Sequence, residues 1–274
     1  MEPASQRLKR RQWRFAAAAE SLGTRAVATE VPIAFTYRGC SYAVMMATPA
    51  DLDDFARGFT LSEGLISSAQ DVSAIDVRTR EEGIVLDIDL AATAMDRFWE
   101  RRRFLAGPSG CGLCGIESLK EALRPIPRVT GTRCFAPDDI AAALTALPAC
   151  QSLGRETRAV HAAALWRPED GTLTLREDIG RHNALDKLIG ATMQENLPLG
   201  EGILLLTSRL SVELIQKAVI AGAGMVVGVS APTALAVRTA ETAGITLIGI
   251  ARDDGFEIFT DAGHLTTAPS ADAA

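Results

Sequence analysis

The sequence predicts an α/β protein with a parallel sheet in its C-terminal half and a smaller, strand-rich N-terminal part. Three continuous apolar runs, GILLLT (202–207), MVVGVS (225–230) and TLIGI (246–250), alternate with two alanine-rich helical patterns. Strands buried on both faces of a parallel sheet have this unbroken apolar composition. The alternation of such strands with helices is typical of βαβ units and therefore of a layered α/β fold.

The N-terminal part is predicted to contain shorter strands and two helices. Residues 31–49 alternate apolar and polar side chains around Arg38-Gly39, which predicts two strands joined by a turn. Aspartates at the start of residues 51–59 suit a helix N-terminus, and the apolar residues there recur at helical spacing. Residues 72–90 predict a second strand pair, and residues 93–106 predict a helix rich in arginine.

These patterns divide the chain into four segments. Residues 1–29 are predicted to be a flexible basic tail, because no apolar region of an export signal follows their arginines. Residues 30–124 form an N-terminal α+β part that ends in a glycine-rich Cys-x-x-Cys loop. Residues 125–265 form the C-terminal α/β part, and residues 266–274 are predicted to be a disordered tail.

Composition and charge narrow the classes of partner. The chain has 274 residues, is 47% hydrophobic and carries a net charge of −6, so it lacks the overall basic character of nucleic-acid-binding proteins. No segment has the long apolar run of a membrane helix. The five cysteines are an odd number in a long chain, which favours a reducing, cytoplasmic setting over a secreted disulfide framework.

Cys111 and Cys114 form the sharpest motif, within Gly110-Cys111-Gly112-Leu113-Cys114-Gly115. Such a pair can supply half of a zinc site, cycle a disulfide or present one activated thiolate. A structural zinc site needs two further ligands, and the other cysteines and histidines lie scattered along the chain. A thioredoxin-type motif follows a strand, whereas this one follows a helix. Arginines at 97–103 would raise the thiolate fraction, so the activated thiolate is favoured over the other two. The alternative for these arginines is a solvated helix face without effect on the thiol.

A second polar block is REDIGRHNALDKLIG (176–190). Residues 181–183 would lie at a helix N-terminus, where an anion can bind, but a capped surface helix is the favoured interpretation of this block alone. His161 lies among small apolar residues and is interpreted as a hydrogen-bonded core histidine. Zinc deaminases carry a glutamate two residues after such a histidine, and this chain has Ala163 there, so deaminase chemistry is not expected.

Taken together, these motifs resemble the FdhD family of formate dehydrogenase accessory proteins. The resemblance extends from about Glu30 to Thr260 and keeps the order of the family's motifs. GCGLCG and REDIGRHNALDKL are its most specific parts. The other matching stretches are EVPIAFTYRGCSYAVMMATPADLDDFARGFTLSEGLI, ERRRFLAGPSGCGLCGIESL, HAAAL, LLLTSRLSVELIQKA, VSAPTALAV and TLIGIARDDGFEIFT.

The resemblance implies a sulfurtransferase. Members of the family take sulfur from a cysteine desulfurase and pass it to the molybdenum bis(molybdopterin guanine dinucleotide) cofactor that formate dehydrogenase needs. Cys111 matches the persulfide-carrying cysteine and Cys114 the second cysteine of the motif. The segment that binds the cofactor falls on Ile250, Ala251, Arg252, Asp253, Asp254 and Gly255, within the C-terminal part.

The resemblance also implies a fold similar to cytidine deaminases and a homodimer. No metal site is expected, because the possible zinc ligands lie scattered along the chain. The alternative function is a chaperone that binds the molybdenum cofactor without covalent sulfur transfer. Two departures from the family stand out. Asp253 and Asp254 occupy positions near which many relatives carry a basic residue, leaving Arg252 as the segment's only cation. Before His161 the chain has Thr157-Arg158-Ala159, where relatives often carry a glycine.

Overall fold

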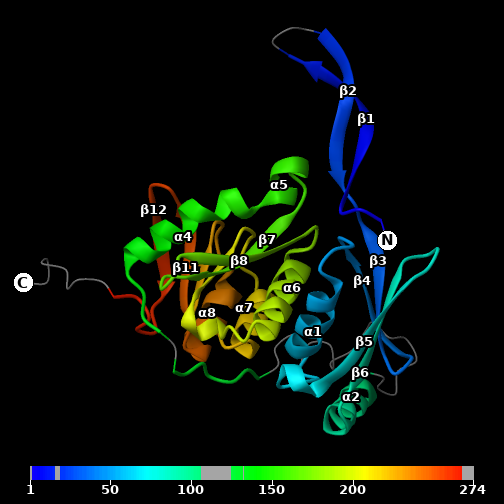
Figure 1. The fold of residues 1–274 in the computed structure, drawn as a ribbon. Helices are drawn as coiled ribbons and strands as arrows, with labels where there is room; N and C mark the ends of the chain where they lie inside the picture. Colours follow the sequence, from blue (N-terminus) through cyan, green and yellow to red (C-terminus); the bar gives the residue numbers. More distant parts are fainter. Residues whose placement is uncertain (1, 16–18, 106–124, 132, 267–274) are drawn as a thin grey trace, which may run out of the picture.

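The computed structural model describes residues 2–15, 19–105, 125–131 and 133–266 of the chain. Figure 1 shows two sheets with helices between them and a two-stranded arm that projects from the body. Core residues of the helices and both sheets are almost fully buried. Among the helices described, none has the length and apolar composition needed to cross a membrane.

The larger sheet has six strands in the order β12-β11-β10-β9-β7-β8. β9, β10 and β11 are parallel, and every residue of β9 and β10 is buried, which confirms the predicted α/β class. The strands are β7 (His161–Arg167), β8 (Thr172–Asp178), β9 (Ile203–Leu206), β10 (Met225–Gly228), β11 (Thr246–Arg252) and β12 (Gly255–Thr260).

Helices cover both faces of this sheet. α4 (Pro137–Cys150) packs on one face, and α6 (Arg181–Gln194), α7 (Val212–Ile220) and α8 (Ala234–Ala243) pack on the other. Alternate strand residues point to opposite layers: Leu204 joins the core under α6 to α8, whereas Leu205 joins the core under α4. The βαβ alternation expected from the apolar runs is therefore present.

The smaller sheet has the order β4-β3-β6-β5 and carries the N-terminal core. Arg38 and Gly39 both have positive φ, as a two-residue hairpin turn requires. Aromatic side chains fill the space between sheet and helices, and the rings of Phe35 and Phe59 lie 4.1 Å apart. The elements are β3 (Val31–Tyr37), β4 (Cys40–Ala47), α1 (Leu52–Ser62), a 3₁₀ turn (Ala69–Asp71), β5 (Val72–Thr79), β6 (Ile84–Leu90) and α2 (Ala92–Leu105).

The prediction of a flexible tail over residues 1–29 is wrong about its structure. β1 (Ser5–Arg14) and β2 (Ala19–Ala28) pair antiparallel over their whole length. At its base the ribbon is held to the body, because Arg25 Nη2 donates to the carbonyl oxygen of Thr157 at 3.2 Å. Two strands can pair through main-chain hydrogen bonds without alternating apolar and polar side chains. A polar two-stranded ribbon therefore cannot be recognised from that pattern in the sequence. The division near residue 125 stays a prediction, and residues 267–274 of the predicted C-terminal tail lie outside the described residues.

Arg158 ends the short helix α5 (Ser152–Thr157) in the left-handed conformation, at φ 58 and ψ 30. A side chain costs energy in that conformation and glycine does not, which explains why glycine suits this position. We expect Arg158→Gly to raise the free energy of unfolding by about 0.5–1 kcal/mol in denaturant titrations. Arg158→Ala keeps the strained backbone and should gain nothing, so equal effects of both substitutions would contradict this account.

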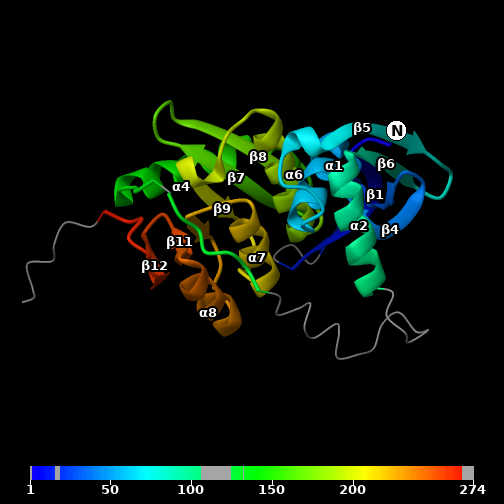
Figure 2. The same cartoon turned by 90° about the horizontal axis from the view of Figure 1, so that it is seen from below.

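α1 and α6 cross in backbone contact between the two sheets, and both views show them side by side (Figures 1 and 2). A Cβ added at Gly58 of α1 would lie 1.7 Å from the carbonyl oxygen of Asp186. A Cβ added at Gly190 of α6 would lie 1.9 Å from the carbonyl oxygen of Asp54. Glycine at both positions therefore allows this close approach of the helix backbones.

Candidate functional site

Cys111 and Cys114 lie outside the described residues. Of their surroundings in the sequence, the structure describes the preceding helix, α2. On α2, Arg97 pairs with Asp71 at 3.1 Å, and Arg101 pairs with Glu63 at 3.3 Å. These two arginines bind α2 to the N-terminal core, and carboxylates match their charge. Because their charges are matched, these arginines would raise the thiolate fraction of a nearby cysteine less than the sequence suggested.

The interpretation of residues 176–190 as a capped surface helix is wrong. Residues 183–192 of α6 are all buried. Lys187 Nζ lies 2.7 Å from Asp178 Oδ2, and neither side chain is exposed. Thr48, which follows β4, contacts both groups: its amide donates to Asp178 at 3.0 Å, and its carbonyl oxygen accepts from Lys187 at 2.9 Å. This ion pair therefore joins the C-terminal core to the N-terminal part.

A second buried ion pair lies farther along α6. Lys217 of α7 contacts both carboxylate oxygens of Asp186 at 2.9 Å, and Ser62 of α1 donates to Asp186 at 2.7 Å. Burial raises the pKa of Asp186, although Lys217 and Ser62 act in the opposite direction. α1, α6 and α7 are thus linked by one buried carboxylate.

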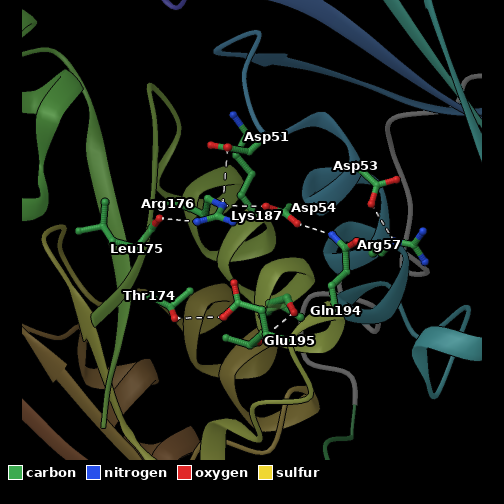
Figure 3. A network of polar contacts seen from close by, with 12 residues as sticks. Asp51, Asp53, Asp54, Arg57, Thr174, Leu175, Arg176, Lys187, Gln194 and Glu195 are labelled. Carbon is green, nitrogen blue, oxygen red and sulfur yellow. Dashed lines mark hydrogen bonds and ion pairs between the residues drawn. The ribbon is translucent and has the colours of Figure 1, made fainter. Parts of the chain in front are cut away.

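A third set of contacts lies between the start of α1 and the large sheet (Figure 3). Arg176 of β8 pairs with Asp54 at 2.7 Å and with Asp51 at 3.7 Å. Gln194 at the end of α6 donates to Asp54 at 2.5 Å. The polar residues of segment 176–190 therefore mainly connect the large sheet to the small one.

Arg181 and His182 belong to the same segment but do not take part in these contacts between the sheets. They are the first two residues of α6, and His182 Nε2 lies 3.5 Å from Ser211 Oγ, the N-cap residue of α7. His161 opens β7 at the same edge of the sheet and is half-buried, so it is not the core histidine expected from its neighbours. Ser211 lies within the matching stretch LLLTSRLSVELIQKA, but nothing in that stretch marks it as a site residue.

Burial and positive neighbours favour the neutral form of both imidazoles. Burial, together with the positive charges of Arg181 and Lys217, lowers the pKa of His182 to about 4, although Glu213 acts in the opposite direction. Burial and Arg181 also lower the pKa of His161, with Asp178 acting in the opposite direction. Burial is the largest cause of both shifts, and the positive neighbours add to it.

We expect His182 to lose its proton near pH 4 in an NMR titration. An unfolded histidine titrates near pH 6.5, so protonation favours the unfolded chain, and this histidine's contribution to stability is lost as the pH falls from about 6.5 to about 4. His182→Gln should remove that part of the pH dependence. A His182 resonance that titrates near pH 6.5 in the folded protein would contradict the buried, positive setting.

The predicted cofactor segment, residues 250–255, forms the end of β11, a turn and the start of β12. Ile250 has φ 51, at a register irregularity between β11 and β12, and its amide donates to the carbonyl oxygen of Ser230, two residues after β10. A β-branched residue in this conformation is strained, and such strain is concentrated at functional sites. Ala251 is buried, whereas Arg252, Asp253, Asp254 and Gly255 are exposed at the tip of the hairpin.

The segment and the histidines share one edge of the large sheet. The carboxyl ends of β9, β10 and β11 lie there, together with the N-termini of α7 and α8. Ligands of open α/β sheets bind beyond this edge. Within the described ranges, no three His, Cys, Asp or Glu side chains gather as a metal site. The zinc alternative involves Cys111 and Cys114 and stays untested.

Comparisons with known proteins agree with this arrangement. A curated protein from Agrobacterium fabrum named sulfur carrier protein FdhD is 50% identical over 244 residues, covering 89% of this chain and 90% of that protein. A protein of the same name from Cupriavidus necator is 52% identical over 227 residues, covering 82% and 78%. The crystal structure of a protein described as a formate dehydrogenase accessory protein, from Desulfotalea psychrophila, matches with a TM-score of 0.75.

That structural match covers 96% of this chain and 100% of the other at 22% identity, so it supports the fold. The sequence model of the FdhD/NarQ family matches residues 28–266, which include both sheets, the helix crossing and the strand edge. The chain therefore belongs to the FdhD/NarQ family.

Proposed function

We propose that this chain is a cytoplasmic sulfurtransferase that carries sulfur on Cys111. The observation that carries the proposal is the motif GCGLCG in a chain about half identical to curated proteins named sulfur carriers. The donor is the persulfide of a cysteine desulfurase. The acceptor is the molybdenum bis(molybdopterin guanine dinucleotide) cofactor of formate dehydrogenase, bound as cargo, and the working form is a homodimer.

The first step is a thiol–persulfide exchange. The Cys111 thiolate attacks the outer sulfur of the donor persulfide, a new S–S bond forms on Cys111, and the donor cysteine leaves as a thiolate. In the second step the Cys114 thiolate attacks the inner sulfur of Cys111. The outer sulfur then leaves as hydrosulfide for the cofactor, and the two thiols supply the two electrons by forming a disulfide.

The strand edge supports the proposed cargo site. Arg252 supplies a positive charge. The backbone of Ile250 is strained and hydrogen-bonds to Ser230. Both residues lie at the carboxyl edge of the strands, where ligands of open α/β sheets bind. Asp253 and Asp254 are exposed at the hairpin tip, so water screens their repulsion of phosphate. The acidic pair therefore does not exclude a nucleotide from this segment.

The decisive experiment supplies the purified protein with a cysteine desulfurase and cysteine and maps the added mass on its peptides. We expect sulfur on the peptide that contains Cys111, and none on that peptide in Cys111→Ala. Cys150→Ala is the matched control, because Cys150 is a free and exposed cysteine on α4. It should leave the modification of Cys111 unchanged.

A Cys111 that stays unmodified, with a desulfurase active on another acceptor, would overturn covalent carriage. Activation of formate dehydrogenase by Cys111→Ala at the wild-type level would do the same. Either result would favour a chaperone that binds and delivers the cofactor. Modification of Cys150 in place of Cys111 would reassign the carrier and contradict the role given to the motif.

A further inference from the structure

The β1–β2 ribbon exposes several large apolar side chains to water. Among the described residues, nine large apolar side chains are exposed, and four of them lie on this ribbon or directly after β1. These four are 53–93% exposed: Leu8, Trp13, Phe15 and Leu22. Two paired strands without a covered apolar face are only marginally stable in water. The ribbon is therefore expected to be covered by another surface.

The ribbon is also basic in an acidic protein. Residues 1–28 hold six Lys or Arg and two Glu. The rest of the chain then holds 22 Lys or Arg and 32 Asp or Glu, a net charge of −10 at pH 7. Opposite net charges attract the ribbon of one molecule to the body of another, and they oppose contact between two ribbons. A second copy of this chain is therefore complementary in charge to the ribbon.

The ribbon points away from its own body. Its contacts with the body lie at its base, where Ser5 donates to Glu156 at 3.2 Å and Arg25 donates to the carbonyl oxygen of Thr157. Figure 1 shows β1 and β2 extending from that base away from both sheets. The exposed apolar side chains of the outer half are thus placed to contact another molecule.

The outer face of the small sheet carries a second exposed apolar surface. Val44 of β4 lies opposite Ala34 of β3, Met46 lies opposite Pro32, and Val85 of β6 lies on the other side of Ala34. Val44 and Met46 are 65% and 49% exposed, because the core under α1 and α2 lies against the opposite face of the sheet. This apolar strip is matched in kind to the ribbon.

Aspartates lie on the same face of the sheet, beside the apolar strip. Asp76 of β5 lies opposite Asp87 of β6, and Asp89 follows on the same side of β6. Arg78 pairs with Asp76 and Asp87, and Arg38 pairs with Asp89, but these arginines are 45% and 55% exposed. Exposed ion pairs of this kind contribute little, so the carboxylates can also pair with cations of a docked ribbon.

We infer that two copies of this chain exchange ribbons, and that each ribbon docks on the outer face of the other copy's small sheet. Trp13 and Leu22 lie on one face of the ribbon, since the residue opposite Leu22 is two positions from Trp13. They would contact Val44 and Met46 of the second copy. A two-fold axis makes this contact twice. The inference rests on the proposed function only for the homodimer, to which it assigns a contact surface.

The first test measures the dimer dissociation constant of the full-length protein by analytical ultracentrifugation. We expect Trp13→Ser combined with Leu22→Ser to raise this constant by about ten-fold or more, because large apolar anchors carry most of the affinity of an interface. Val44→Ser combined with Met46→Ser should do the same from the other side of the contact. Ile258→Ser is the matched control, because this exposed apolar residue lies on β12, outside the proposed contact.

Combining the four substitutions should weaken the dimer little more than either pair alone, because both pairs remove the same contact. Raising the salt concentration should slow association, since opposite charges draw ribbon and body together. Thermal unfolding of each variant verifies that it is folded.

A cross-link locates the contact directly. A photoreactive benzoylphenylalanine takes the place of Trp13, and chains labelled with light and heavy nitrogen are mixed before irradiation. We expect cross-links between light and heavy chains, on the peptide that contains Val44 and Met46.

Several results would overturn the ribbon exchange. A wild-type protein that stays monomeric at tens of micromolar would do so, as would a dimer that both double substitutions leave intact or that Ile258→Ser weakens equally. Cross-links confined to one chain would show that the ribbon contacts its own body. Binding of a monomer to anionic vesicles or to RNA, lost in Trp13→Ser with Leu22→Ser, would give the ribbon a different partner.

Sulfur carriage is measured separately, as added mass on Cys111. A monomeric wild-type protein with a persulfide on Cys111 would reject the ribbon exchange and the homodimer, and it would keep the sulfur carrier. A dimer that the ribbon substitutions split, with Cys111 unmodified, would keep the exchange and reject covalent carriage.

Discussion

Replacing Lys187 with alanine is expected to lower the free energy of unfolding by about 3–5 kcal/mol. The substitution leaves the Asp178 carboxylate in the core without its cation, and both side chains are 0% exposed. It also leaves the carbonyl oxygen of Thr48 without the ammonium donor that lies 2.9 Å away. Water cannot replace either contact without opening the junction between β4 and α6, so the loss of both contacts lowers the free energy of unfolding. Urea denaturation measures it directly.

Two further variants test whether burial causes this loss. Arg78→Ala breaks the exposed ion pair of Arg78 with Asp76, whose atoms lie 2.7 Å apart, and should change stability far less. Lys187→Met combined with Asp178→Asn removes both charges and should recover part of the loss. If Lys187→Ala cost no more than Arg78→Ala, the buried pair would not hold the two parts together.

The sequence predicts elements whose signal is local. The apolar runs of β9, β10 and β11 and the turn at Arg38-Gly39 appear where expected, because burial on both faces and positive φ each leave a residue pattern. The same holds for the position of residues 250–255 at a strand end. The left-handed conformation of Ile250 was not predictable, since a β-branched residue disfavours it.

Features that depend on distant partners could not be predicted. Asp178 and Asp186 contact Thr48 and Ser62, residues more than 100 positions earlier in the chain. From the sequence alone, those carboxylates look like the polar face of a surface helix. Their partners become known only when α1 is placed against α6. The grouping of Arg181 and His182 with Ser211 and His161 has the same origin, because the last two come from other elements.

Gly190→Ala is expected to lower the free energy of unfolding by about 3 kcal/mol or more, although the same change in an ordinary helix gains about 1 kcal/mol. The added Cβ would lie 1.9 Å from the carbonyl oxygen of Asp54, and a backbone atom cannot rotate away as a side chain can. α1 would have to move off α6. That movement would strain the pairing of Asp54 with Arg176 and the hydrogen bond between Ser62 and Asp186.

Ala142→Gly, at an exposed position within α4, is the matched control and should cost about 1 kcal/mol through helix propensity alone. Opposite substitutions would then both destabilise the protein, which only a steric limit at Gly190 explains. Hydrogen exchange should quicken in α1 as well as α6, because the two helices share the strained contact. A Gly190→Ala protein more stable than wild type would show that the helices can separate freely, and the sheets would then not depend on this crossing.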